Sequence, residues 1–154
     1  MCSELTRHKN GSQWRNFYGR FKGKALSAKQ SKTIRNELAK YSIKNISWED
    51  NPQRKPLNLT ELFAKKHIWL EIGFGGGEHL MHQAKLNPDI GIIGCEPYIN
   101  GLAMLLRKLS DNPCYNVRIY DGDARNIFDV LPKSSIEKVF LLYPDPWPKK
   151  KHHR

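Results

Sequence analysis

The chain has 154 residues, of which 39% are hydrophobic and 27% charged, and its formal net charge at pH 7 is +11. That length suits one domain with at most a small appendage. The sequence holds no apolar run long enough to span a membrane, and residues 1–10 show no apolar signal-peptide core. Cys2, Cys95 and Cys114 are odd in number and lack metal-ligand spacing, which favours a reducing cytoplasm over a disulfide framework or a zinc site.

The charge is unevenly distributed along the chain. Residues 1–66 carry fifteen Lys/Arg against five Asp/Glu, residues 67–148 carry seven against ten, and the last six residues carry four basic groups and no acid. Basic segments on both sides of a mildly acidic core favour a polyanionic partner, most simply nucleic acid, over a role in solubility alone. Residues 14–24 also interleave aromatic with basic side chains, which suits base stacking and phosphate contact. The alternatives are a disordered arm or an arm that packs its aromatic rings on the main domain.

The first expected helix follows a capping box formed by Ser27 and Gln30. It runs for about three turns and places three apolar residues on one face: Ile34, Leu38 and Tyr41. Residues 42–57 contain two prolines and no periodicity, so we interpret them as a linker. A short helix over 59–66 is expected to lead into the next part of the chain. We therefore divide the chain into a basic arm, helix and linker (1–57) and a main domain (58–154).

The main domain alternates short apolar strands with helices. The expected strands are 68–73, 90–95, 117–120 and 138–143, and the expected helices are 78–86, 98–109 and 124–131. Near-continuous apolar strands separated by helices indicate an α/β fold with a doubly wound, mostly parallel, Rossmann-like sheet. Right-handed crossovers then bring the carboxyl ends of all the strands to one rim, where ligands bind.

A glycine-rich loop joins the first of these strands to its helix. The pattern is Glu71-x-Gly73-x-Gly75-x-Gly77. A dinucleotide fingerprint needs its third glycine at position 78, where this chain has Glu78, so an NAD-type oxidoreductase is disfavoured. An acid before G-x-G-x-G resembles the first motif of S-adenosylmethionine-dependent methyltransferases, in which a carboxylate suits the ammonium of the cofactor and loop N–H groups suit its carboxylate. The alternative is a glycine-rich turn without a ligand.

Four acids stand at or just beyond the strand ends: Glu71, Glu96, Asp123 and Asp145. Glu96 closes the second strand, where an acid accepts hydrogen bonds from both ribose hydroxyls; its alternative role is a surface acid before a helix. Asp123 follows the third strand and is placed either to accept from an adenine amino group or to cap the next helix.

The segment Pro144-Asp145-Pro146-Trp147-Pro148 follows the fourth strand. Proline fixes φ, so this loop is stiff and holds Asp145 at the rim. We interpret Asp145 as a site residue, and Trp147 either as a wall or stacking surface of the site or as a core anchor.

Taken together, these motifs resemble the bacterial tRNA (guanine-N7)-methyltransferase family. The resemblance rests on Glu71-Ile72-Gly73-Phe74-Gly75, Gly94-x-Glu96, Asp123-Ala124 and Pro144-Asp145-Pro146-Trp147-x-Lys149, with an N-terminal contribution from residues 16–30. It implies S-adenosylmethionine as cofactor, a guanine in the variable loop of tRNA as substrate, and no metal. It also implies Asp145 as the catalytic residue and Lys149 as a substrate contact. The cofactor-binding residues that it implies are Glu71, Gly73, Gly75, Gly77, Glu96, Asp123, Ala124 and Asp145.

Members of that family continue well past Pro-Asp-Pro-Trp, whereas this sequence ends in the basic stretch 149–154. We therefore expect a C-terminally incomplete domain whose fourth strand is left as an apolar edge. Three explanations are open: the chain is a fragment, it is a truncated gene product, or a second chain completes it. The rival to a methyltransferase is a non-catalytic remnant that still binds RNA or cofactor.

Overall fold

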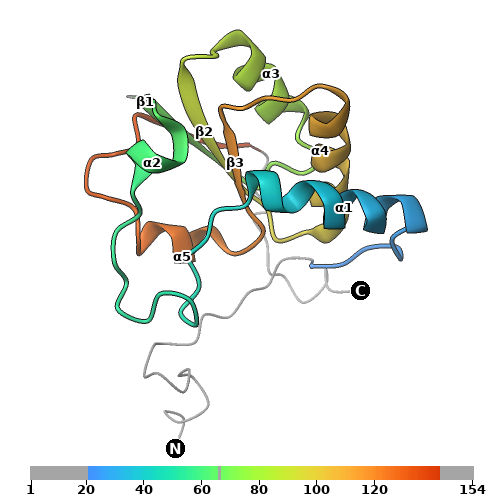
Figure 1. Ribbon diagram of the computed structural model, residues 1–154, viewed down its shortest axis with the longest axis horizontal. Helices are drawn as coiled ribbons and strands as arrows, with labels where there is room; N and C mark the ends of the chain where they lie inside the picture. Colours follow the sequence, from blue (N-terminus) through green and yellow to red (C-terminus); the bar gives the residue numbers. More distant parts are fainter. Residues whose placement is uncertain (1–20, 66, 143–154) are drawn as a thin grey trace, which may run out of the picture.

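The computed structural model describes residues 21–65 and 67–142, and Figure 1 shows their arrangement. The secondary structure confirms the predicted alternation of strands and helices. In chain order the elements are α1 (Ala28–Tyr41), α2 (Leu59–Phe63), β1 (His67–Ile72), α3 (Glu78–Leu86), β2 (Ile90–Cys95), α4 (Ile99–Asp111), β3 (Val117–Tyr120), α5 (Ala124–Phe128) and β4 (Lys138–Leu141).

The described strands form one parallel sheet in the order β3-β2-β1-β4. Trp69 of β1 stands opposite Ile92 of β2 on one side and Lys138 of β4 on the other. Because the order reverses at β1, the chain winds in both directions from the middle of the sheet, which confirms the predicted Rossmann-like α/β fold. All four carboxyl ends therefore lie at one rim.

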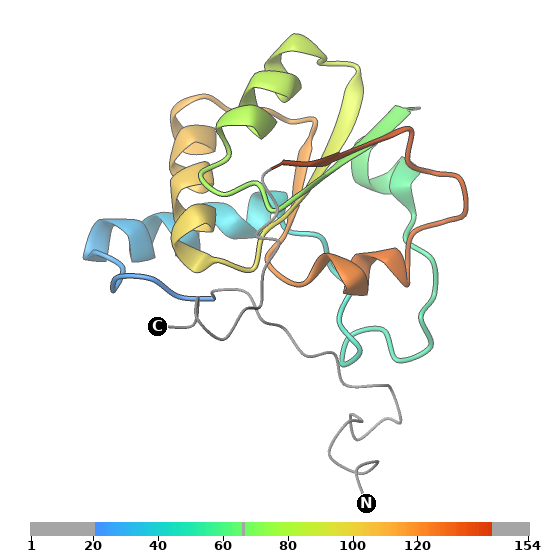
Figure 2. The ribbon, with the colours of Figure 1, turned by 180° about the vertical axis from the view of Figure 1, so that it is seen from behind.

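Helices cover both faces of the sheet, each over its own hydrophobic cluster. One cluster joins the sheet to α1, α3 and α4, and the other joins it to α2, α5 and the segment before α2. Figures 1 and 2 show the two groups of helices on opposite sides of the strands. Along β1 the buried side chains alternate between the clusters, with Trp69 in the first and Ile68 and Leu70 in the second. Both faces are apolar for this reason.

Helix α1 begins with the predicted capping box. Ser27 Oγ accepts from Gln30 N, and Gln30 Oε1 accepts from Ser27 N. The apolar face also matches the prediction, since Ile34, Leu38 and Tyr41 pack into the cluster shared with α4. The helix is thereby fixed on the domain by its apolar stripe.

The segment 42–57 differs from the linker that we expected. Ile43, Ile46 and Leu57 are buried in the second cluster, and Ile43 N donates to Ile119 O at the edge of β3. Arg54 fastens the segment by donating to Ile46 O and to a backbone carbonyl of α5. The apolar residues of this segment do not recur at helix or strand spacing, so the sequence gives no sign that they are buried. Their burial depends on packing against distant parts of the chain. The division of the chain at residue 57 stays a prediction.

Strand β4 forms an edge of the described sheet, as Figure 2 shows in dark red. Within residues 21–65 and 67–142 it pairs with β1 alone, and Val139 and Leu141 are 52% and 56% exposed. This agrees with the expected apolar edge. No helix in this described part of the chain is long and apolar enough to cross a membrane.

Candidate functional site

The glycine loop between β1 and α3 is built from three left-handed residues. Gly73, Gly75 and Gly77 have φ values of 71°, 55° and 77°. Such values strain any residue with a side chain, so the loop requires glycine. Apart from its chain neighbours, a Cβ on Gly73 or Gly75 would meet no atom of residues 21–65 or 67–142 within 4 Å, whereas one on Gly77 would lie 2.5 Å from Leu105 Cδ1. Within the described part of the chain, the first two glycines therefore face open space that a ligand can occupy, and the third packs against α4.

Helix α4 supports this loop from behind. Besides the contact between Leu105 and Gly77, Lys108 Nζ donates to Gly76 O and to Glu78 Oε1. The hydrogen bond from Lys108 lowers the pKa of the Glu78 carboxyl below its ordinary value. Glu78, the residue that stands where a dinucleotide-binding motif has glycine, thus helps to fix the loop to α4.

Glu71 lies in β1, before the loop, with its side chain turned toward α3. It is 2% exposed, and its Oε2 lies 2.8 Å from His79 Nδ1. An ionised carboxylate only accepts, so Nδ1 is the donor in that state. Burial raises the pKa of Glu71, and the hydrogen bond with His79 acts in the opposite direction. The His79 ring stacks edge-on against Phe140 of β4, with 4.7 Å between ring centroids, which fixes the ring across the rim.

Glu96 joins the glycine loop to the start of α4. Its Oε2 accepts from Gly75 N at 2.7 Å, and its Oε1 accepts from Tyr98 N at 2.9 Å. Glu96 as a whole residue is 8% exposed. Each carboxylate oxygen has a second lone pair, so these backbone bonds leave acceptor capacity for hydroxyl groups. The carboxylate that we expected near a ribose is thus held next to the open side of the loop.

Asp123 follows β3 by three residues and caps α5. Its Oδ1 accepts from Arg125 N at 2.9 Å, and its two oxygens accept from Arg125 Nε at 2.9 and 3.0 Å. Ala124, the first residue of α5, is half-buried against the second cluster. The capping role is the alternative that the sequence left open for Asp123; a contact with adenine stays a prediction.

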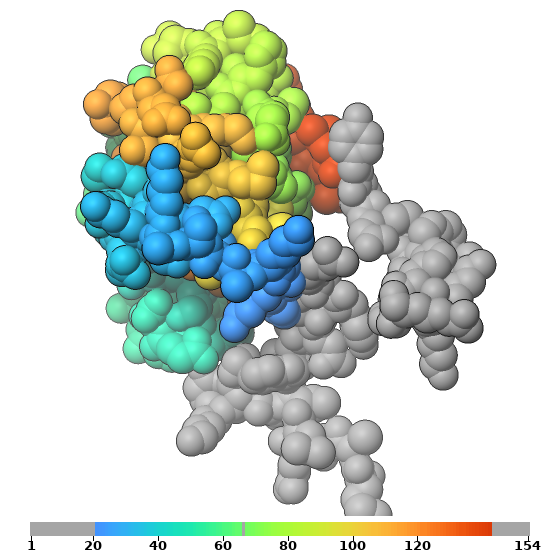
Figure 3. All heavy atoms as spheres, turned by 90° about the vertical axis from the view of Figure 1, so that its right-hand side faces the viewer, coloured from blue at the N-terminus to red at the C-terminus, as the bar shows by residue number. Residues whose placement is uncertain are grey.

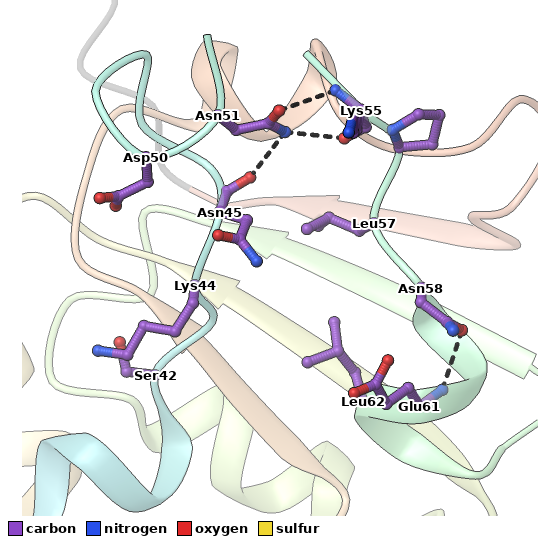
Figure 4. Close-up of a pocket in the computed structure, with 11 residues that line it drawn as sticks. Ser42, Lys44, Asn45, Asp50, Asn51, Lys55, Leu57, Asn58, Glu61 and Leu62 are labelled. Atoms are coloured by element: carbon purple, nitrogen blue, oxygen red, sulfur yellow. Dashed lines mark hydrogen bonds between the residues drawn. The ribbon is translucent and has the colours of Figure 1, made fainter. Parts of the chain in front are cut away.

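A separate hollow of about 530 Å³ lies between the segment 42–58 and α2 (Figure 4). Its lining includes none of Glu71, Glu96 or the three loop glycines. One wall is fixed by the segment itself, since Asn51 Nδ2 donates to Asn45 O and Lys55 O. The side chain of Asn51 thus uses its polar groups within the segment, because its Oδ1 also accepts from Lys55 N.

Comparison with known proteins shows to which family this chain belongs. Residues 65–154 match a protein family described as "Putative methyltransferase". The chain belongs to this methyltransferase family. The match covers the glycine loop, the rim acids and the Pro-Asp-Pro-Trp segment.

Several relatives of this chain carry a more specific name. The chain is 55% identical over 148 residues to a tRNA (guanine-N(7)-)-methyltransferase of Ruegeria sp. (strain TM1040), covering 96% of this chain and 58% of the relative. It is 60% identical over 140 residues to the protein of that name from Roseobacter denitrificans (91% and 60% covered). It is 49% identical over 138 residues to the one from Agrobacterium fabrum (88% and 57% covered). The chain thus spans about three fifths of the length of these relatives.

The structure brings some of the predicted methyltransferase residues together and leaves others undescribed. Glu96 is hydrogen-bonded to Gly75 of the loop, and Glu71 pairs with His79 in the helix that follows the loop. Asp123 lies three residues beyond strand β3, as the N-cap of α5. Asp145 and Lys149 lie outside the described residues. Leu141, the last residue of β4, stands opposite Ile72 at the end of β1, so β4 ends beside the start of the glycine loop.

Sequence reasoning missed His79 and Asn100. The first is the side-chain partner of Glu71, and its place in the first turn of the helix after the loop could have drawn attention to it. The second binds backbone atoms more than seventy residues away, and no local pattern indicates it.

Proposed function

We propose that this chain is the S-adenosylmethionine-binding part of a tRNA (guanine-N7)-methyltransferase, and that it directs methyl transfer to N7 of a variable-loop guanine. One observation carries the proposal: the open glycine turn at Gly73 and Gly75 is joined through Gly75 N to the carboxylate of Glu96. The names of the relatives supply the substrate class.

The residues fit this cofactor. The buried carboxylate of Glu71 suits an ammonium group, and the open turn leaves room for backbone N–H groups to meet a carboxylate. Glu96 then accepts from ribose hydroxyls, while Asp123 and Ala124 border the adenine. When bound, S-adenosylmethionine supplies an electrophilic methyl group on a sulfonium.

The substrate atom sets what the protein must do. Guanine N7 has a free lone pair and no proton to lose, so methyl transfer requires no general base. Catalysis is then mainly positioning and electrostatic stabilisation. In this proposal Asp145 holds the guanine by its N–H edge and stabilises the charge that develops on the ring, and Lys149 contacts the tRNA.

Two features outside the rim accompany the proposal. The excess of basic residues in 1–66 provides attraction for tRNA. The free thiols Cys95 and Cys114 are buried, which agrees with a protein of the reducing cytoplasm.

The test is transfer of labelled methyl from S-adenosylmethionine to an unmodified tRNA transcript by the 154-residue chain, with N7-methylguanosine as the product that is measured. Asp145→Asn is the matched variant, because it keeps the shape and removes the charge. We expect product from the wild type, and from the variant a rate about 100-fold lower with unchanged affinity for S-adenosylhomocysteine. Equal rates would refute the role of Asp145. A folded wild type without product would favour the non-catalytic remnant.

A further inference from the structure

Residues 21–26, here called the strap, cross the start of α4. Ile99 N donates to Phe21 O at 3.0 Å, so the strap begins on a backbone hydrogen bond. Asn100 then uses both ends of its side-chain amide, because its Oδ1 accepts from Gly23 N at 2.9 Å and its Nδ2 donates to Lys24 O at 2.8 Å. Three hydrogen bonds thus join segments that lie more than seventy residues apart in sequence.

The fit at Gly23 adds a steric component to this contact. A Cβ on residue 23 would lie 2.1 Å from Tyr98 Oη and 3.2 Å from Asn100 Oδ1. A side chain there would have to displace the Tyr98 ring and weaken the bond to Asn100. The strap therefore lies closely against α4 because residue 23 is a glycine.

The same turn of α4 also borders the glycine loop. Tyr98 N donates to Glu96 Oε1, and a Cβ on Gly101 would lie 2.3 Å from Gly75 O. Asn100 stands between these two positions in sequence. The strap is thus attached next to the loop that we propose for the cofactor, and Figure 3 shows the blue strap beside the yellow start of α4.

The strap presents two cations at this place. Lys22 and Lys24 are both exposed, and neither forms an ion pair with any residue in 21–65 or 67–142. Exposed lysines that lack a protein partner are suited to neutralise phosphate groups. Anchoring them beforehand reduces the ordering cost when a polyanion binds.

We propose that Asn100 is a positioning residue, which holds Lys22 and Lys24 beside the glycine loop so that their ammonium groups contact phosphates of the RNA substrate. This inference rests on the proposed function for its partner. It adds a surface and an anchor residue that the rim acids do not supply.

The experiment measures equilibrium binding of an unmodified tRNA transcript from 50 to 200 mM salt, and binding of S-adenosylhomocysteine in parallel. In the Lys22→Gln/Lys24→Gln variant, loss of two phosphate contacts should reduce the slope of log affinity against log salt by about 1.4–1.8, which is about 25- to 60-fold in affinity at 0.1 M salt. Asn100→Ala should shift the slope and affinity in the same direction by a smaller amount. Affinity for S-adenosylhomocysteine should stay within about twofold in both variants.

The matched control is Lys85→Gln/Lys133→Gln, which removes the same charge from two exposed lysines outside the strap and the rim. The inference predicts a clearly smaller effect in this control. It is overturned if the control loses as much as the strap variant, if the strap variant and Asn100→Ala keep the wild-type slope, or if the wild type binds no tRNA. A parallel loss of S-adenosylhomocysteine binding in Asn100→Ala would also overturn it, because Asn100 would then support only the fold of α4. Since binding is read without turnover, a chain that binds through the strap yet forms no N7-methylguanosine contradicts the proposed function alone.

Discussion

Gly101 lies in α4, where the helix meets the backbone of the glycine loop. Two effects oppose each other in Gly101→Ala. Replacing a helical glycine by alanine gains about 1 kcal/mol of stability from helix propensity. The new Cβ would, however, lie 2.3 Å from Gly75 O and 3.0 Å from Gly75 C, and both of these atoms belong to the backbone.

Backbone atoms cannot rotate away as a side chain does, so the helix and loop must separate. Overpacking of this kind costs about 1–3 kcal/mol, and we take the upper half of that range because the contact is with backbone. The expected net result is a loss of about 1–2 kcal/mol in the free energy of unfolding, or about 2–8 °C in Tm. Because the displaced loop carries the Gly75 N–H that binds Glu96, we also expect affinity for S-adenosylhomocysteine to fall about tenfold.

Urea unfolding followed by circular dichroism measures the first effect, and calorimetric titration measures the second. Ser110→Ala is the control, because this exposed position of α4 reports helix propensity without the steric contact and should gain about 0.5 kcal/mol. A Gly101→Ala protein that is about 1 kcal/mol more stable than wild type, with unchanged ligand affinity, would show that the contact with Gly75 imposes no steric cost.

Two further predictions concern buried polar groups. Burial raises the folded-state pKa of Glu71 above its ordinary value of 4.5, so the folded state binds the proton more tightly and wild-type stability falls as pH rises from about 4.5 through the folded pKa. Glu71→Gln should therefore gain stability relative to wild type across that pH window. The measurement is the urea midpoint of each protein from pH 4 to 7. A difference between the two midpoints that does not change with pH would contradict this prediction. Asn116 Nδ2 lies 3.1, 3.1 and 2.9 Å from the carbonyl oxygens of Ala84, Asn87 and Ile90, so Asn116→Ala should lose about 2–4 kcal/mol in urea unfolding, and a loss below about 1 kcal/mol would count against it.

The sequence was sufficient to predict those parts of the fold in which apolar residues recur at regular helix or strand spacing. The stripe of Leu102, Leu105, Leu106 and Leu109 on α4 is fully or almost fully buried, as its spacing indicates. The capping box at Ser27 depends on residues three apart, and it forms as predicted. Continuous apolar strands between helices were enough to predict the parallel sheet, because only a sheet covered on both faces buries them.

The remaining features depend on contacts between distant parts of the chain. Ile43 and Ile46 carry no period, yet they fill the second hydrophobic cluster. The placement of Glu96 at a strand end was visible in sequence, but its bond to Gly75 depends on how close α4 lies to the loop. Asn100 and the strap are more than seventy residues apart in sequence. Local patterns in a single sequence do not reveal such a contact.

We propose that the loop with Glu71 and Glu96 binds an amino-acid-bearing nucleoside rather than a dinucleotide. The most direct test of this proposal is calorimetric titration of the 154-residue chain with S-adenosylhomocysteine and, separately, with NAD⁺. We expect saturable binding of S-adenosylhomocysteine at one site, abolished in Glu96→Ala, and no binding of NAD⁺. A folded chain that binds NAD⁺, or that binds neither compound, would contradict it.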